Sequence, residues 1–147
     1  MISKRYLRKY IKRMFNIDVE IDIKHHFWGG YGAIAYEGTE TELPLIEIAK
    51  SELKDKLPRY IIWHEVGHLF TAVGNGCGVK NEVAAQMWAM REAKKRGYTK
   101  VYKELLKYVR DWTDDSEKSC VNDKMYRVAG YIILNKLGAQ KVEHYKV

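Results

Sequence analysis

The chain of 147 residues has little of what marks several large classes of protein. It contains only two cysteines, Cys77 and Cys120, which are too few for a disulfide scaffold and suit a reducing cytosol. It has no run of about 18 apolar residues, so no membrane-spanning helix is expected. Its basic N-terminus lacks the apolar stretch and the small-residue cleavage site of a secretory signal. We therefore expect a cytoplasmic protein.

The sequence also lacks internal repeats, low-complexity tracts and any stretch that resembles a linker. Because this length is sufficient for one hydrophobic core, we expect a single compact domain over residues 1–147. The net charge is +7, from 26 basic and 19 acidic residues. This excess permits contact with nucleic acid without requiring it, and no motif that reads nucleic acid accompanies it.

The most informative stretch is His64-Glu65-Val66-Gly67-His68. On an α-helix its two histidines lie one turn apart on the same face, so both imidazoles can bind one metal ion. Glu65 lies near enough to act on a water that the metal holds. Zinc fits best, because it accepts nitrogen ligands in a tetrahedral site that can keep one position open. The flanking apolar residues predict a helix that begins at Pro58 and stops in the glycine-rich stretch 74–78.

A third ligand must come from elsewhere, because catalytic zinc usually has three protein ligands. One long form of the motif would have Gly and His where this chain has Thr71 and Gly74, so that form is excluded. Glu82 is the better candidate, because a helix that follows a glycine-rich turn can bring its carboxylate back to the histidines. Gln86, one turn later, could accept a hydrogen bond from the distal nitrogen of a zinc-bound histidine. Two alternatives stay open: Glu82 as a solvated or capping carboxylate, and Cys77 as a rival ligand.

Two motifs taken together resemble a known group of enzymes. They are His64-Glu65-x-x-His68 and Glu82-x-x-Ala85-Gln86-x-Trp88-Ala89. The pair is similar to the zincin metallopeptidases with a glutamate third ligand, and most similar to the ImmA/IrrE-like family, over about residues 44–90. Gln86 stands where that family has Asn or Asp, and Trp88 where it has Phe. The resemblance implies one zinc ion per chain, held by His64, His68 and Glu82, with Glu65 as general base and a protein or peptide as substrate.

The resemblance also implies an α+β fold of zincin type, in which a small three-stranded twisted sheet packs on the metal-bearing helix. In that family the substrate peptide lies antiparallel along an edge strand, held by main-chain hydrogen bonds. Residues 31–36 and 44–49 are the two candidates for this strand. A tyrosine or histidine often stabilises the oxyanion in related enzymes. The candidates here are Tyr131, His144, Tyr145 and Tyr98.

Periodicity predicts the remaining elements. Strands are expected over residues 17–26, 31–36 and 44–49. The first two are expected to form a hairpin around Trp28-Gly29-Gly30, and the third begins with Pro44, which an edge strand allows. His25-His26, at the end of the first strand, could line a site but are more typical of a surface. Besides the motif helix, helices are expected over residues 2–15, 80–96, 100–110 and 121–137, with Thr99 as a cap and Gly97 and Gly138 as stops.

The helix expected over residues 2–15 is basic and amphipathic, and it has two interpretations. It could be an arm for a polyanion or a membrane surface, or a helix packed on the domain with a solvated basic face. We favour the packed helix, because its apolar stripe is wide enough to belong to the core. The main hypothesis of function is a zinc-dependent metallopeptidase. The alternative is a non-catalytic regulatory or nucleic-acid-associated module that zinc stabilises.

Overall fold

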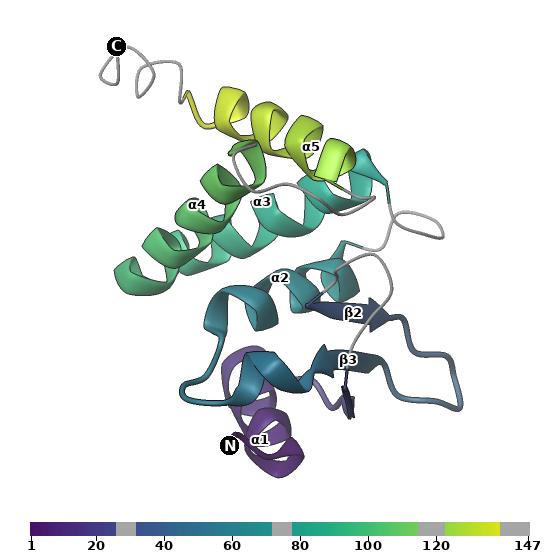
Figure 1. The fold of residues 1–147 in the computed structure, drawn as a ribbon. Coiled ribbons are helices and arrows are strands. Elements are labelled where there is room, and N and C mark those ends of the chain that lie inside the picture. The colour runs from purple at the N-terminus through teal and green to yellow at the C-terminus, as the bar shows by residue number, and fades with distance from the viewer. Residues whose placement is uncertain (26–31, 72–77, 115–122, 139–147) are drawn as a thin grey trace.

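The computed structural model describes residues 1–25, 32–71, 78–114 and 123–138. In these parts of the chain it has an α+β fold with five α-helices and a small three-stranded sheet, as expected. The elements in order are α1 (Lys4–Phe15), β1 (Glu20–Lys24), β2 (Ala33–Tyr36), β3 (Leu45–Ala49), the short 3-10 helix η2 (Lys50–Leu53), α2 (Arg59–Phe70), α3 (Val79–Lys95), α4 (Thr99–Thr113) and α5 (Asp123–Lys136). Figure 1 shows α2 between the sheet and α1 on one side and α3, α4 and α5 on the other.

The sheet order is β1-β3-β2, with β3 parallel to β1 and antiparallel to β2. The predicted hairpin of the first two strands is therefore wrong, and of the two candidate edge strands, residues 44–49 form the central one. The physical reason is burial: β3 carries Ile46, Ile48 and Ala49, all buried, and a strand buried in this way takes the position that is paired on both sides. Among the described strands, β1 and β2 are the edges.

The register of β2 decides which of its backbone groups are open. The Ala49 N–H donates to the Gly32 carbonyl at 2.8 Å, and Ala35 stands opposite Ile46. Because hydrogen-bonded and non-bonded pairs alternate along an antiparallel ladder, the backbone N–H and C=O groups of Ala33 and Ala35 point away from β3. The outer edge of β2 is thus the side on which those two residues offer hydrogen bonds.

The first helix packs on the rest of the molecule, as favoured above. It begins after Ser3, whose hydroxyl accepts a hydrogen bond from the Tyr6 backbone N–H at 3.1 Å, and not at residue 2. Its buried face consists of Leu7, Tyr10, Ile11 and Phe15. The Trp63 indole N–H donates to the Tyr10 hydroxyl at 2.9 Å, which links α1 to α2. The basic side chains of α1 lie on its exposed face.

Several of the predicted helix ends can be compared with the structure. Gly97 and Gly138 follow α3 and α5 with φ values of 76° and 75°, the left-handed region that favours glycine, so both predicted stops are confirmed. The predicted cap at Thr99 is wrong: Thr99 is the first residue of α4, and no side chain caps this helix. The motif helix α2 begins one residue after Pro58 and ends at Phe70.

Some predictions concern residues outside the described parts of the chain. They are His26, the turn Trp28-Gly29-Gly30, residues 72–77 of the glycine-rich stop with Cys77, Cys120, and the oxyanion candidates His144 and Tyr145. Within the described residues, no helix combines the length and the apolar character that a membrane span requires.

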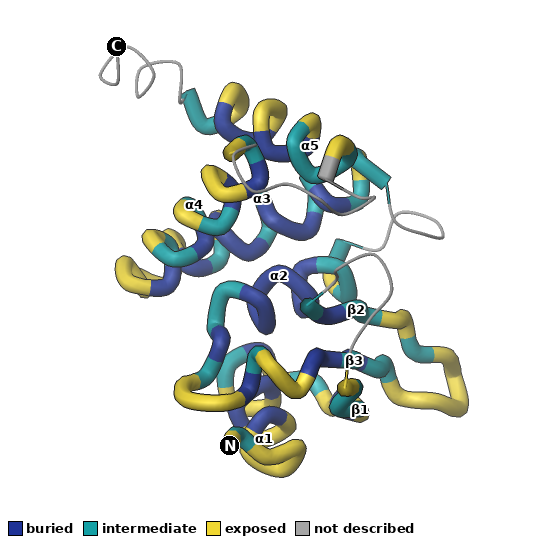
Figure 2. Tube along the Cα trace, viewed as in Figure 1, coloured by how far each residue is buried: buried dark blue, intermediate teal, exposed yellow. Residues whose placement is uncertain are grey.

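The helix α2 is buried on nearly all sides, which is unusual for a helix of a small protein. Every residue from Ile61 to Gly67 is buried, and Figure 2 shows this stretch in dark blue between the two layers. It packs on β2 from one side and on α3 and α4 from the other. Two polar residues, His64 and Glu65, are therefore held in the interior of the molecule and not on a surface.

Candidate metal centre

Three of the predicted site residues meet between α2 and α3. Nε2 of His64 lies 2.9 Å from Oε1 of Glu82 and 3.1 Å from Nε2 of His68, and Nε2 of His68 lies 3.1 Å from Oε2 of Glu82. In the parts of the chain that the structure describes, these residues form the one group of three that could hold a metal ion. Ligand atoms about 2.1 Å from a tetrahedral zinc lie about 3.4 Å apart, so a small outward shift of the three side chains accommodates the ion.

A close contact between two helices brings Glu82 to the histidines. A Cβ atom on Gly67 would lie 2.9 Å from the Ala85 carbonyl carbon and closer still to its oxygen. The absence of a side chain at Gly67 thus lets the backbone of α3 approach α2 between the two histidines. Glu82 lies one turn before Ala85 on α3, so its side chain reaches the face of α2 that carries His64 and His68. Glu82 and Ala85 are both buried.

Gln86 fixes the proton of His64. The Gln86 side-chain N–H donates to the Leu105 carbonyl at 2.9 Å, which leaves its amide oxygen directed at Nδ1 of His64, 2.7 Å away. Nδ1 therefore carries a hydrogen and donates it, and Nε2, the nitrogen directed at Glu82, is the one available to a metal ion. The predicted hydrogen bond between Gln86 and the distal nitrogen is present, and Gln86 is fully buried.

The Nε2 atoms of both histidines and the carboxylate of Glu82 converge on one point. Because all three groups are electron-pair donors, they repel one another unless a proton or a metal ion lies between them. Burial opposes protonation of His64, but the hydrogen bond and charge of Glu82 outweigh burial and raise the pKa of His64 to about 9. Burial would likewise raise the pKa of Glu82, but its hydrogen bonds to both imidazoles hold that pKa well below its usual range. In the metal-free protein the cation is a proton, and a metal ion must displace it. Two imidazoles and one carboxylate are the donors that zinc accepts.

Glu65 lies beside this group but is not one of its three members. Its side chain is buried, and burial raises the pKa of its carboxyl group above the usual value, although the neighbouring histidines oppose this shift. The backbone N–H of Ala35, on the open edge of β2, is hydrogen-bonded to the carboxylate. The carboxylate is thus held between the candidate metal ligands and the edge of the sheet.

An aromatic wall that was not predicted from the sequence covers the other side of the His64 ring. The rings of Trp112 and Tyr108 stand edge-on to His64, with centroids 5.5 Å and 6.0 Å away. The Trp112 indole donates a hydrogen bond to the Tyr108 hydroxyl. Burial first, and then the charge of Glu65, raises the pKa of Tyr108, so this phenol keeps its proton. The signal was available: Leu105, Tyr108 and Trp112 follow helical spacing, but the predicted helix stopped at residue 110.

Other candidate residues lie elsewhere. The Tyr98 ring packs on Trp63, with centroids 5.9 Å apart, and Tyr131 is 52% exposed on α5. His25 is exposed at the end of β1. None of these three belongs to the group that could hold a metal ion within the described residues.

Comparisons of the chain with models of known protein families, with curated proteins and with solved structures found no match. The chemistry of the centre therefore has to be argued from its own residues.

The role of Gln86 leads to a first prediction. Replacing it by Leu removes the acceptor that orients His64, and zinc affinity is expected to fall by about 10- to 100-fold. Competition with a chromophoric chelator measures this affinity, and circular dichroism of the metal-free variant reports whether the helices persist. A Gln86→Leu variant that is folded and binds zinc as tightly as the wild type would contradict the role of Gln86.

Proposed function

We propose that the chain is a zinc-dependent metallopeptidase. The observation that carries the proposal is the convergence of Nε2 of His64, Nε2 of His68 and a Glu82 oxygen on one point, with the Glu65 carboxylate buried beside them. A site that only stabilised a fold would have no need of a second carboxylate, outside the ligand set, in the interior, because burying an ionisable group is unfavourable. Three protein ligands also leave a tetrahedral ion one open position.

When bound, zinc would supply a water of lowered pKa and would polarise the carbonyl of a peptide bond. Glu65 is the group that takes a proton from the attacking water and then passes it to the leaving amine. Burial supports this role, because the raised pKa of Glu65 brings its proton affinity closer to that needed near neutral pH. His64, His68 and Glu82 hold the ion, and Gln86 keeps His64 in the tautomer that can bind it.

The edge strand β2 is the proposed binding place for the substrate backbone. Of the two strands considered from the sequence, residues 44–49 are paired on both sides, whereas the outer edge of β2 is open within the described residues. An extended peptide added along this edge would meet the outward backbone groups of Ala33 and the outward carbonyl of Ala35. Because the Ala35 N–H is also bonded to Glu65, a peptide held there lies within reach of the general base.

Tyr108 is the proposed donor to the oxyanion that forms on the attacked carbonyl. Its hydroxyl already accepts a hydrogen bond from Trp112, so its own proton is available to donate. Its ring stands against His64, and its hydroxyl lies close enough to Glu65 for the carboxylate charge to affect it. A preorganised donor of this kind stabilises negative charge where the charge develops during the reaction.

The proposal is tested by reconstitution. Protein freed of metal by a chelator is expected to bind one equivalent of zinc and then to cleave a reduced, carboxymethylated protein. The cleavage should disappear on renewed chelation and return when zinc is added. Tight binding of one zinc ion without cleavage of any unfolded protein in a broad panel would refute the peptidase.

A second candidate is the zinc-stabilised module that contacts nucleic acid. The observation that favours it is the exposed basic face of α1, made of Lys4, Arg5, Arg8, Lys9, Lys12 and Arg13. Only the Lys12 amine of this set lies near a described carboxylate, that of Asp18 at 3.2 Å. Steeply salt-dependent binding of duplex DNA without proteolysis would favour this candidate over the peptidase.

A further inference from the structure

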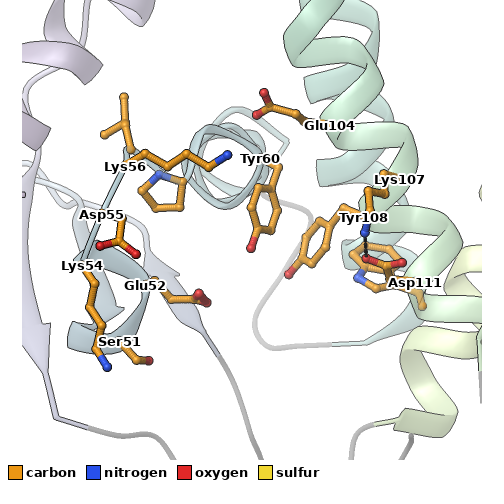
Figure 3. A pocket seen from close by; sticks show the side chains of 13 residues that line it. Ser51, Glu52, Lys54, Asp55, Lys56, Tyr60, Glu104, Lys107, Tyr108 and Asp111 are labelled. Carbon is orange, nitrogen blue, oxygen red and sulfur yellow. Dashed lines mark hydrogen bonds and ion pairs between the residues drawn. The ribbon is translucent and has the colours of Figure 1, made fainter. Parts of the chain in front are cut away.

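A cavity of about 580 Å³ lies next to the metal centre. The short helix η2 and the loop that follows it form one wall, and α4 forms the other, with Tyr60 of α2 between them (Figure 3). Lys54, Lys56 and Lys107 are exposed and stand at its rim, so the cavity opens to solvent. Its volume is typical of pockets that bind small molecules or long side chains.

The cavity shares a wall with the candidate active site. Tyr108 and Trp112 line the cavity, and their rings also stand edge-on to the His64 imidazole. Tyr60 packs edge-on against Tyr108, with centroids 4.8 Å apart, and lies one helical turn before His64 on α2. A peptide side chain close to the bond that is cleaved could therefore enter the cavity past Tyr108.

One carboxylate in the cavity differs from the others. Glu52 extends from η2 toward the hydroxyl groups of Tyr60 and Tyr108, as Figure 3 shows. Within the described residues it has no hydrogen-bond or ion-pair partner, and burial alone raises the pKa of its carboxyl group. By contrast, Asp111 is paired with Lys107 at 3.0 Å, and Glu104 is paired with Arg59. Lys54 and Lys56, the remaining bases of the lining, form no ion pair with Glu52.

A half-buried carboxylate without a cation, faced by aromatic rings, is complementary to one class of side chain. Lysine and arginine combine a positive group, which would bind Glu52, with an apolar stem that packs on aromatic surface. Aromatic faces also attract cations directly. A neutral side chain would leave Glu52 unpaired and less solvated, and an acidic one would be repelled, so the cavity selects against both.

We propose that this cavity is the subsite that gives the peptidase its specificity, and that it binds a lysine or arginine side chain of the substrate through Glu52. The inference rests on the proposed peptidase function, because it assumes a peptide held at the metal centre. Glu52 determines specificity in this arrangement and takes no part in the proton transfers.

The first experiment maps cleavage sites. The zinc-loaded wild type, acting on unfolded proteins, is expected to show lysine and arginine enriched at one fixed position relative to the cleaved bond. For two peptides that differ only by lysine or norleucine at that position, the lysine peptide should have the higher kcat/KM by about tenfold, mainly through KM. Glu52→Gln should abolish this difference, and Glu52→Lys should shift the preference to acidic residues.

Asp55→Asn is the matched control, because Asp55 is a carboxylate of the same wall but is exposed. Its preference for the lysine peptide should equal that of the wild type. Cleavage by the wild type with no preference for basic residues at any position would overturn the subsite while leaving the peptidase intact. So would an unchanged preference in folded Glu52→Gln and Glu52→Lys variants.

The second experiment does not depend on hydrolysis. In a zinc-loaded Glu65→Gln background, nuclear magnetic resonance compares binding of N-acetyl-lysine N-methylamide with that of the norleucine analogue, using the Trp112 indole signal. The lysine compound is expected to bind several-fold more tightly, and adding Glu52→Gln should remove this advantage. Equal binding of the two compounds would overturn the subsite. A protein that cuts nothing would refute the proposed function, and the binding comparison would then decide the role of the cavity by itself.

Discussion

Replacing Glu65 by Gln is expected to lower kcat by about a thousandfold while one zinc ion per chain stays bound. The amide has nearly the size of the carboxylate, so the packing around this buried residue is preserved. It cannot accept a proton from water, which removes the one group near the centre that is suited to this step. Zinc retention is expected because the three residues that could hold the ion do not include Glu65. Initial rates on an unfolded protein, together with zinc content, measure both effects.

The stability of this variant provides a further check, and its sign follows from the pKa of Glu65. Burial raises the pKa of Glu65 in the folded protein. At any pH above the pKa of this carboxyl group in the unfolded chain, its ionisation therefore favours the unfolded chain and lowers the stability of the wild type. At neutral pH the Gln variant should therefore be no less stable to denaturant than the wild type. A loss of activity can then be assigned to chemistry and not to unfolding.

A matched control for this replacement is Glu92→Gln on α3, because Glu92 belongs neither to the candidate metal ligands nor to the proposed catalytic groups. Glu92 forms an ion pair with Arg96 at 3.2 Å and has no part in the proposed mechanism. Its kcat should stay within about twofold of the wild type, since such pairs contribute little to stability. Wild-type activity in Glu65→Gln itself would refute the assignment of Glu65 as general base.

The metal ligands were the part of the site that sequence could suggest most directly. His64 and His68 follow from local geometry, because residues four apart on one helix lie on the same face. The position of Glu82 after the glycine-rich stretch made it the better candidate for the third ligand, and the family resemblance favoured it, but local spacing could not exclude a solvated or capping carboxylate. The structure brings it to the histidines through the contact at Gly67, which depends on the packing of two helices.

The order of the strands could not be read from local pattern. The alternation of residues 17–26 and the glycines after them suggested a hairpin. Such a local pattern cannot show that a third strand, distant in sequence, lies between the first two in the sheet. The strand that pairs on both sides is selected by how much apolar surface it buries, which depends on the whole core. The same holds for Glu52, which reaches the cavity beside the centre from an element distant in sequence.

Replacing Gly67 by Ala is expected to have the largest effect on the structure. In an ordinary helix this change is favourable by about 1 kcal/mol, because alanine has the higher helix propensity. Here the added methyl group would overlap the Ala85 carbonyl, a backbone group that cannot rotate away. We expect the overlap to dominate and to lower the free energy of unfolding by about 3 kcal/mol, the upper range for overpacking a core. Denaturant titration of the metal-free protein measures this change.

The same overlap should weaken zinc binding by at least about tenfold, because α3 must move away from α2 and takes Glu82 with it. Gly78→Ala is the control: a Cβ at Gly78 has nothing within 4 Å, so both the stability and the zinc affinity of that variant should stay close to those of the wild type. Ala85→Gly should not rescue Gly67→Ala, since the obstacle is a carbonyl and not a side chain. A Gly67→Ala variant with unchanged zinc affinity would mean that Glu82 reaches the histidines by some other means than the close approach of these two helices.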